Sequence, residues 1–263
     1  MTETSLLFSV DDAGVARIVL SRPDKGNAID QDMADRLLNA AISCTNDPAI
    51  RCVVLTGAGR LFCAGGDVAE FGMPAGDIPT ILTRLAGALH QAMALFAAMR
   101  KPLVVLVNGP AAGAGLSLAL SGDIVLATPS AHFTAAYGLL GLTPDGGMTW
   151  LLPRMVGMRR AQDIILTNRR VSAEEAASIG IVTRLVDEDA LATEGDVLAA
   201  RLAAGATDAI GGAKALLQGS FKAGFAEQTD METRFIAAAG RGHEGSEGIA
   251  AYLARRKPDF RGA

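Results

Sequence analysis

One stretch of this sequence decides the fold: Asn108-Gly109-Pro110-Ala111-Ala112-Gly113-Ala114-Gly115. It directly follows an apolar run, Leu103–Val107, which is typical of a strand buried on both faces of a sheet. An earlier stretch repeats the pattern, because the run Cys52–Thr56 leads through Gly57 to the cluster Ala64-Gly65-Gly66. Two such units side by side would place two glycine-rich turns at the same edge of the sheet, although both turns could equally be plain connections between strands.

Strand-like and helix-like patterns alternate around these two units. The predicted strands lie at residues 6–10, 15–20, 52–56, 103–107, 124–127 and 181–186, and a turn at 11–14 joins the first two. The predicted helices lie at 31–46, 78–99 and 173–179, and the pattern from about 189 onward is helical. The first helix has one apolar stripe, formed by Met33, Leu37, Leu38, Ala41 and Ile42. We therefore expect an α/β body at residues 1–200, followed by a helical region at residues 201–263.

The ends of the short helix at 173–179 carry explicit signals. Ser172 and Glu175 have the spacing of a capping box, in which each side chain binds a free backbone N–H of the first turn. Gly180 follows the last helical residue, where a left-handed conformation stops a helix. We expect this helix to end at Gly180 and to lead into the strand at 181–186.

The composition excludes several classes of protein. The chain has 263 residues, of which 50% are hydrophobic and 20% charged, so it can build a core and does not have the composition of a disordered chain. Its formal net charge of −4 does not favour a nucleic-acid binder. Three cysteines and three histidines, none with the spacing of metal ligands, indicate neither a disulfide scaffold nor a metal site.

The sequence does not indicate export or a membrane span. Glu3 stands where a signal peptide carries Lys or Arg. Residues 102–122 contain no charge and are long enough to cross a bilayer, but Asn108, Pro110 and several glycines interrupt them. This punctuation predicts a strand, a turn and a second buried element. We expect a cytoplasmic protein that does not contact a membrane.

The small residues of the two turns point to backbone chemistry. Neither turn has the pattern G-x-x-x-x-G-K-[ST], and Gly113-Ala114-Gly115 lacks the third glycine of a dinucleotide-binding loop. Small side chains leave backbone N–H groups open, and two fixed donors that converge on one point form an oxyanion hole. That interpretation requires both turns to face the same pocket.

Four further positions have a functional and a plain interpretation. Asp145 either caps a following helix or is a carboxylate that its apolar neighbours keep ready for proton transfer near neutral pH. His90, in the middle of a predicted helix, is either a structural or solvated residue or a catalytic one. Tyr137 is either a core aromatic or a pocket hydroxyl. The run Arg255-Arg256-Lys257 is either a solvated helix end or a phosphate contact.

A serine hydrolase is a rival interpretation. Gly115-Leu116-Ser117-Leu118-Ala119 is one residue away from the pattern G-x-S-x-G, and Ser117, Asp145 and His243 follow the chain order of an α/β-hydrolase triad. The serine of such a site lies on the turn directly after a strand, whereas Ser117 comes well beyond Val107. The hydrolase interpretation is therefore the weaker one.

Five segments together resemble the enoyl-CoA hydratase/isomerase (crotonase) superfamily, and they extend over nearly the whole chain. They are Leu61–Asp67, Asn108–Gly115, Gly141–Gly147, Ser172–Gly180 and Tyr252–Phe260. The resemblance implies a crotonase-type α/β fold, a spiral of ββα units with a C-terminal helical trimerisation region. It also implies a homotrimer or a dimer of trimers, and an acyl-CoA thioester as substrate. Coenzyme A would enter with that substrate, so no cofactor and no metal is expected.

The resemblance also implies roles for individual residues. Gly66 and Ala114 match the positions that supply the oxyanion-hole N–H groups. The positions that match coenzyme A or substrate contacts are Lys25, Gly26, Ala28, Ala64, Gly65, Asp67, Val68, Ala112, Gly115 and Lys257.

Departures from the family pattern bear on the reaction. Hydratases of this superfamily use two glutamates, and Ser117 and Tyr137 stand at those positions here. Asp145 stands where isomerase branches carry their acid, and residues 140–154 are similar to the ring-epoxide phenylacetyl-CoA isomerases. The resemblance thus favours an isomerase that shifts a double bond through a thioester enolate, with Asp145 as acid and base.

Three alternatives remain open. The 4-chlorobenzoyl-CoA dehalogenases have residues matching His90 and Asp145, and their pocket tryptophan corresponds to Tyr137. A hydrolase of this dehalogenase or thioesterase type would use Asp145 and His90. The others are an enoyl-CoA hydratase-type lyase and a protein that binds coenzyme A with little chemistry.

Overall fold

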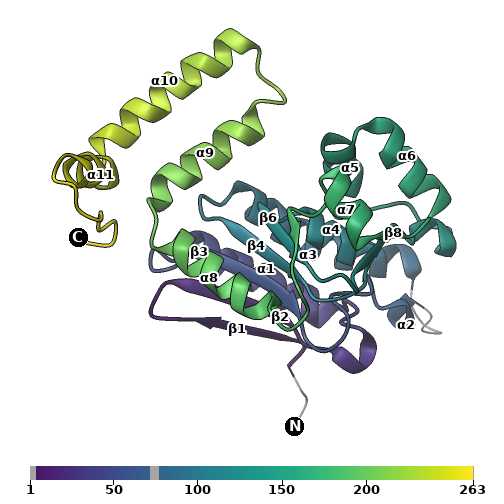
Figure 1. Cartoon of the computed structure of the whole chain (residues 1–263). Coiled ribbons are helices and arrows are strands. Elements are labelled where there is room, and N and C mark those ends of the chain that lie inside the picture. Colours follow the sequence, from purple (N-terminus) through teal and green to yellow (C-terminus); the bar gives the residue numbers. More distant parts are fainter. Residues whose placement is uncertain (1–3, 72–76, 263) are drawn as a thin grey trace.

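The computed structural model describes residues 4–71 and 77–262 (Figure 1). Glu3, on which the expectation of no export rests, lies outside the described residues. Figure 1 shows a sheet flanked by helices, with helices α9 to α11 extending away from it.

A six-stranded sheet forms the centre of the molecule. Its order is β1 (Leu6–Val10), β2 (Val15–Leu20), β3 (Cys52–Gly57), β4 (Leu103–Val107), β6 (Ile124–Ala127) and β9 (Arg184–Leu185). The pair β1 and β2 is antiparallel, and all other neighbours are parallel. Thr56 pairs with Leu106, so β3 and β4 end side by side and their following turns begin at the same edge.

A second, smaller sheet lies beside that edge. It consists of β5 (Ala111–Ala112), β7 (His132–Thr134) and β8 (Val171–Ser172). An isolated bridge between Cys63 and Ala111 joins the turn after β3 to the turn after β4. The two glycine-rich segments are therefore paired with each other directly.

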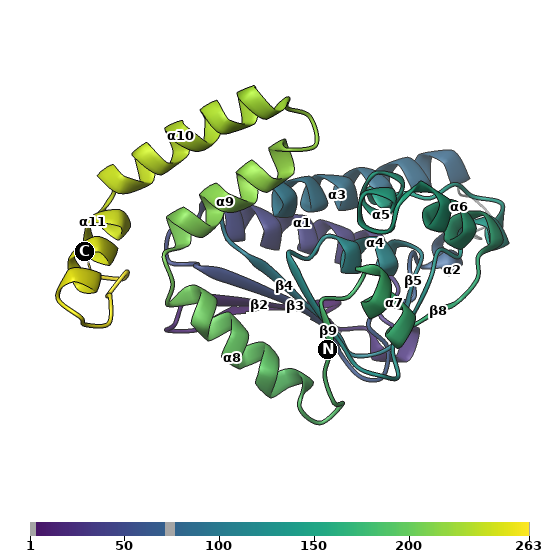
Figure 2. The same ribbon diagram turned by 45° about the horizontal axis from the view of Figure 1, so that its top comes forward.

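Eleven helices and two short 3₁₀ turns complete the described part of the chain. They are α1 (Gln31–Asn46), α2 (Val68–Phe71), α3 (Ile78–Ala98), α4 (Ala114–Leu120), α5 (Met148–Val156), α6 (Met158–Thr167), α7 (Ala173–Ile179), α8 (Leu191–Ala203), α9 (Thr207–Gly219), α10 (Phe225–Arg241) and α11 (His243–Leu253), with 3₁₀ turns at Pro23–Lys25 and Tyr137–Leu140. Helices α1 and α3 lie along one side of the sheet and α8 along the other (Figure 2).

The central strands are apolar throughout because each faces two cores. Val53 and Leu55 of β3 belong to the larger core, with α1 and α3, whereas Val54 belongs to a smaller core under α8. In β4, Val105 and Val104 divide in the same way. Burial on both faces explains why each of these strands is a continuous apolar run in the sequence.

Most of the predicted elements are confirmed. The hairpin, the strands at 52–56, 103–107 and 124–127, and the helices at 31–46 and 78–99 appear with nearly the expected bounds. Ser172 accepts a hydrogen bond from Glu175 N, and Gly180 ends α7 with a left-handed conformation. The other half of the expected capping box is not formed, because the Glu175 carboxylate accepts from Arg169 instead. The uncharged segment 102–122 is β4, β5 and α4, which is the expected strand, turn and buried element.

Two expectations are wrong. Ile42 is 42% exposed, because α1 buries the face that carries Met33, Leu37 and Ala41 instead. The strand expected at 181–186 contracts to β9, because the N–H groups of residues 181 and 182 donate to Ala176 O at the end of α7.

The C-terminal helices form an extension from the body. Lys214 of α9 is buried and donates to Asp123 Oδ2 over 2.8 Å, which fixes α9 against the body. Beyond it, large apolar side chains are exposed: Leu217, Phe221, Phe225, Ile236, Ile249, Tyr252 and Leu253. The domain boundary expected after residue 200 falls inside α8, and the division itself stays a prediction.

One helix of the described chain, α3, has the length and apolar composition of a membrane span. It packs along α1 and buries Leu85, Leu89 and Phe96 in the larger core. The core helix of a soluble protein can meet the same criterion of length and composition, although only 33% of the apolar window of α3 is buried here.

Candidate active site

The two glycine-rich turns face each other at one cavity. A Cβ on Gly65 would lie 3.0 Å from Ala112 O and 3.6 Å from Ala114 N, so only a residue without a side chain permits this approach. Gly65 also has a φ of +103°, which glycine adopts without strain. Gly65, Gly66, Gly113 and Ala114 all line a cavity of about 240 Å³. The turns therefore do more than connect strands.

Two backbone N–H groups are left without an acceptor in the wall of this cavity. Ile29 N donates to Gly65 O over 2.7 Å, and Asp67 N donates to Ile29 O over 2.9 Å. In a trans peptide the N–H points opposite to the C=O, so the N–H of Gly66 points away from Ile29. Among the residues that the structure describes, none accepts from it.

The second N–H belongs to Ala114, at the start of α4. The first N–H groups of a helix have no partner inside the helix, and they point outward from its N-terminal end. Gly113 O accepts from Ser117 N over 3.2 Å, which fixes the Gly113–Ala114 peptide in the helical direction. Two convergent donors of this kind can bind the oxygen of a polarised carbonyl group.

The cavity is mostly apolar and contains one carboxylate. Its larger apolar side chains come from several elements and are Ile29, Val68, Leu82, Leu85, Leu89, Leu140 and Leu142. Within the described ranges, the polar side chains that line it are those of Tyr137, Thr143 and Asp145. A single acid in an apolar cavity, near two N–H donors, is suited to moving a proton on a bound carbonyl compound.

Tyr137 and Asp145 form a dyad. The Tyr137 phenol donates to Asp145 Oδ1 over 2.6 Å. Burial, together with the negative charge of Asp145, raises the pKa of Tyr137 above its usual value. Tyr137 therefore stays a neutral hydrogen-bond donor over the physiological pH range. Of its two interpretations, the pocket hydroxyl is the one that fits its place in the cavity lining.

The turn that carries Asp145 is held by two more side chains. Ser117 Oγ donates to Asp145 O over 2.9 Å. Gly146 N donates to His90 Nε2 over 2.9 Å, and the same nitrogen lies 3.7 Å from Asp145 Oδ2. His90 projects from the middle of α3 toward this turn, so it belongs to the site. Because Nε2 accepts a hydrogen bond, the neutral imidazole carries its proton on Nδ1.

The structure contradicts two interpretations of the sequence, namely that Asp145 caps a helix and that the protein is a serine hydrolase. Asp145 does not cap α5, because Gly147 occupies the N-cap position and the Asp145 carboxylate faces Tyr137. The hydrolase triad does not exist. Ser117 is fully buried inside α4, and His243 begins α11, which lies far from α4 in both views (Figures 1 and 2).

The residues assigned to coenzyme A fall into four groups. Ala64, Gly65 and Val68 line the cavity, and Gly26 and Ala28 lie beside it, since Ala64 N donates to Gly26 O. Ala112 and Gly115 pack against Cys63, where a Cβ on Gly115 would collide with Cys63 O. Lys25 is exposed, and Lys257 is exposed beyond α11, at the other end of the molecule from α5 (Figure 1). Asp67 is ion-paired with Arg22.

Sequence reasoning missed two residues that support the site. Asn27, fully buried with a φ of +55°, donates from Nδ2 to Ala58 O and Leu61 O and so holds the turn after β3. Arg22 binds Asp67, which directly follows that turn, and the carbonyl oxygen of Ala28, which follows Asn27. The resemblance assigned Lys25 and Gly26 of the loop 22–27 to coenzyme A, but neither Arg22 nor Asn27 was singled out, although Asn is among the residues that tolerate a positive φ.

Metal ligands and reactive thiols are absent from the described part of the chain. It holds no group of three or more His, Cys, Asp or Glu residues that could bind a metal ion. Cys44, Cys52 and Cys63 are free and buried, and burial raises the pKa of each thiol to about 12. These thiols are therefore protonated and unreactive.

The fold and the site together define an enzyme of the enoyl-CoA hydratase/isomerase (crotonase) family. The chain matches the description of the enoyl-CoA hydratase/isomerase family over residues 11–263, and so belongs to it. It is 38% identical over 257 residues to the 1,2-epoxyphenylacetyl-CoA isomerase of Escherichia coli (strain K12), a comparison that covers 97% of this chain and 98% of that protein.

Two further comparisons agree. The chain is 34% identical over 232 residues to 4-chlorobenzoyl coenzyme A dehalogenase-2 of Arthrobacter sp, covering 88% of this chain and 84% of that protein. A Mycobacterium abscessus crystal structure assigned to the enoyl-CoA hydratases/isomerases has a TM-score of 0.93 and 36% identity, covering 98% of this chain and 100% of that one. The resemblance to the superfamily and to its isomerase and dehalogenase branches is confirmed.

Proposed function

We propose that this enzyme is an acyl-CoA isomerase that moves a double bond through a thioester enolate. The thioester oxygen would sit between the N–H groups of Gly66 and Ala114, which then act as an oxyanion hole. Negative charge develops on this oxygen when a proton leaves the carbon next to the carbonyl. Two preorganised donors stabilise that charge, and losing one such donor typically costs about 10²–10³ in rate.

Asp145 would remove that proton and return it to another carbon. The observation that carries the proposal is the Tyr137–Asp145 hydrogen bond in a cavity where Asp145 is the single carboxylate of the described lining. One carboxylate can accept a proton from one carbon and donate a proton to another, which balances an isomerisation. The relative from E. coli, an isomerase by name, supports this choice of reaction.

Hydration needs a second acid or base to activate water. Tyr137 and Ser117 stand where hydratases of the superfamily carry glutamates, and the raised pKa of Tyr137 keeps it neutral. Ser117 is buried and already donates to the Asp145 backbone. Neither side chain is suited to take a proton from water, so a lyase of the hydratase type is the less favoured proposal.

One contact favours a second candidate, a hydrolytic aryl-CoA dehalogenase or thioesterase. His90 Nε2 lies 3.7 Å from Asp145 Oδ2, and the dehalogenase relative belongs to that class by name. In that mechanism Asp145 would attack the substrate and His90 would activate water. The hydrogen bond from Gly146 N occupies Nε2, however, and this favours a positioning role for His90.

Coenzyme A would enter with the substrate, and we propose no cofactor of the enzyme's own. Gly26, Ala28, Ala64 and Gly65 would contact coenzyme A next to the cavity, of which Ala64 and Gly65 form part of the lining. For Lys257 to reach coenzyme A, another copy of the chain would have to supply it. We propose a homotrimer or a dimer of trimers in the cytoplasm, which would cover the exposed apolar side chains of α9 to α11. Sedimentation velocity would test the oligomer.

Mass spectrometry of the CoA products from one mixed panel tests the reaction. The panel contains 2-enoyl-, 3-enoyl-, aryl- and halobenzoyl-CoA. A product of unchanged mass and altered retention supports isomerisation, and deuterium taken up from heavy water confirms the proton transfer. A mass gain of one water would show hydration, and exchange of halogen for hydroxyl would show the dehalogenase. Binding without product or deuterium exchange would leave a coenzyme A-binding protein.

A further inference from the structure

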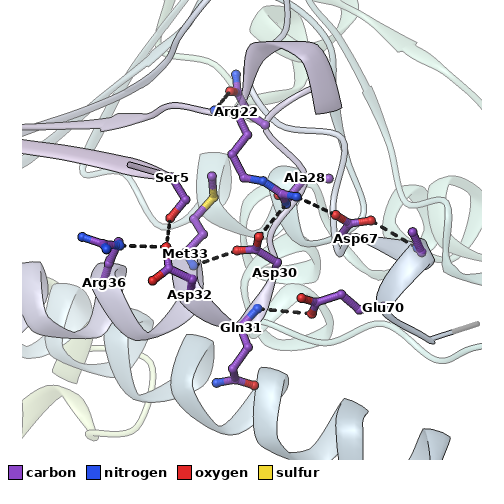
Figure 3. Close-up of polar contacts among 12 residues, drawn as sticks. Ser5, Arg22, Ala28, Asp30, Gln31, Asp32, Met33, Arg36, Asp67 and Glu70 are labelled. Carbon is purple, nitrogen blue, oxygen red and sulfur yellow. Dashed lines mark hydrogen bonds and ion pairs between the residues drawn. The ribbon is translucent and has the colours of Figure 1, made fainter. Parts of the chain in front are cut away.

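The turn that carries Gly66 is held from outside the cavity by one guanidinium group. Arg22, just after β2, donates from Nη2 to Asp67 Oδ2 over 2.8 Å and from Nη1 to Ala28 O over 2.6 Å. Its Nη1 also lies 3.1 Å from Asp30 Oδ2. Figure 3 shows the guanidinium between the carboxylates of Asp30 and Asp67.

These contacts enclose the bridge that orients the Gly66 N–H. Ile29 pairs with Gly66, and both hydrogen bonds of that bridge use Ile29. Arg22 binds the residues on either side of Ile29, which are Ala28 and Asp30, and also Asp67, the residue that follows Gly66. One side chain thus fixes both strands of the bridge.

The two carboxylates are themselves anchored to backbone. Asp30 Oδ1 accepts from Met33 N over 2.8 Å and caps α1, and Asp67 Oδ1 accepts from Ala69 N over 3.1 Å at the start of α2. The side chains of Arg22, Asp30 and Asp67 are only 19%, 17% and 14% exposed. Solvent therefore screens their interaction little.

We propose that Arg22, through Asp67 and Asp30, is a positioning residue that sets the direction of the Gly66 N–H in the oxyanion hole. This inference rests on the proposed function, because it assumes that a thioester oxygen binds that N–H. It gives Asp67 a different role from the coenzyme A contact that the resemblance implies. Neither Arg22 nor Asp67 is part of the cavity lining, so the effect is transmitted through the backbone.

The test compares Arg22→Gln and Asp67→Asn with a matched control, Arg36→Gln. Arg36 forms an ion pair of the same 2.8 Å length with Asp32 on α1, but that pair is solvent-exposed and does not touch the Gly66 turn (Figure 3). The measurements are kcat and KM for the substrate, the Kd of free coenzyme A, and the infrared carbonyl band of bound benzoyl-CoA labelled with ¹³C at the thioester carbon. Free coenzyme A has no acyl oxygen, so its Kd does not depend on the oxyanion hole.

We expect Arg22→Gln and Asp67→Asn to lower kcat by up to about 10²-fold, since a displacement of about 1 Å at a reacting group has that effect. The Kd of free coenzyme A should stay unchanged, and the carbonyl band should move back toward its position in free benzoyl-CoA. Adding Asp67→Asn to Arg22→Gln should cost little more, because the ion pair of Asp67 is already lost with Arg22.

Three outcomes would overturn the inference. The first is that both variants match Arg36→Gln in kcat. The second is that they weaken coenzyme A binding with kcat intact, which would show that Asp67 is a coenzyme A contact. A wild-type complex whose carbonyl band is not displaced at all would refute the oxyanion hole itself. That result is distinguishable, because it appears before any substitution is made. If Arg22→Gln fails to fold, the near-isosteric Asp67→Asn carries the test alone.

Discussion

Tyr137 donates a 2.6 Å hydrogen bond to Asp145 Oδ1, and this bond closes the connection between β7 and α5, on which both residues lie. Tyr137 follows the small sheet, whereas Asp145 precedes α5. With Oδ1 engaged by the phenol, the proton-transfer work proposed for Asp145 is left to Oδ2. The bond thus selects one oxygen of the carboxylate as the acid and base.

Replacing Asp145 by Asn should lower kcat by about 10²–10⁴-fold, because the amide cannot take a proton. The side chain keeps its shape, and its amide oxygen can still accept from Tyr137, so KM and the folded structure should change little. Turnover and deuterium uptake of the acyl group from heavy water measure the effect. Near-normal deuterium uptake in this variant would assign the proton transfer to another residue.

His90 can be tested with a pair of variants. His90→Ala removes the acceptor of the Gly146 N–H, which is worth about one neutral hydrogen bond, so turnover should fall by no more than about tenfold. His90→Gln offers an oxygen to the same N–H and should retain more activity. Steady-state kinetics on the isomerisation substrate and on halobenzoyl-CoA measure both. A loss of about 10²–10⁴-fold in both variants would instead mark His90 as a base and favour the hydrolytic candidate.

The fold could be predicted from the sequence because its signals are local. Continuous apolar runs gave β3 and β4, and the Ser172 cap and Gly180 gave both ends of α7. The two glycine clusters pointed to the cavity because only small residues allow such close backbone approach. The local signal was insufficient at 181–186. There the N–H groups of residues 181 and 182 donate to Ala176 O of α7, so these residues do not join the expected strand.

The support of the site could not be predicted, because it depends on partners far apart in the chain. Arg22 and Asp67 are brought together only when β2 and β3 pair, and no spacing in the sequence marks them. His90 was left open between a structural and a catalytic role, although its spacing on α3 favours a place at the cavity. Leu82, Ala86 and His90 recur at intervals of four residues and so share one face of α3, and the first two line the cavity.

Gly65 should not tolerate a side chain. In Gly65→Ala the methyl group would lie 3.0 Å from Ala112 O at a φ of +103°, which should cost about 1–3 kcal/mol of unfolding free energy. Crowding between the two N–H donors should also lower kcat. Urea denaturation and kinetics measure the two effects.

Gly87→Ala is the matched control for that substitution. Gly87 lies inside α3, and nothing lies within 4 Å of the position where its Cβ would be, so alanine should stabilise the protein by about 0.8–1.0 kcal/mol through helix propensity. Its kcat should stay at the wild-type value. Equal losses in the two variants would show that the effect at Gly65 is not specific to the cavity.

The buried Tyr137 phenol should make the free energy of unfolding fall as the pH rises in the alkaline range. The native structure raises the pKa of Tyr137 above its usual value of about 10, chiefly by burial, whereas the unfolded chain keeps the usual value. Above pH 10 the unfolded state therefore releases a proton that the native state retains, and the unfolding free energy falls as pH rises. Between pH 9 and pH 11 this phenol should account for a loss of about 1.4 kcal/mol.

Tyr137→Phe lacks the titrating group but retains every other one, so urea unfolding of both proteins at several pH values isolates the contribution. The wild type should be the more stable protein at pH 9, and its advantage should narrow toward pH 11. An advantage that stays constant would mean that the native structure does not raise the pKa of Tyr137.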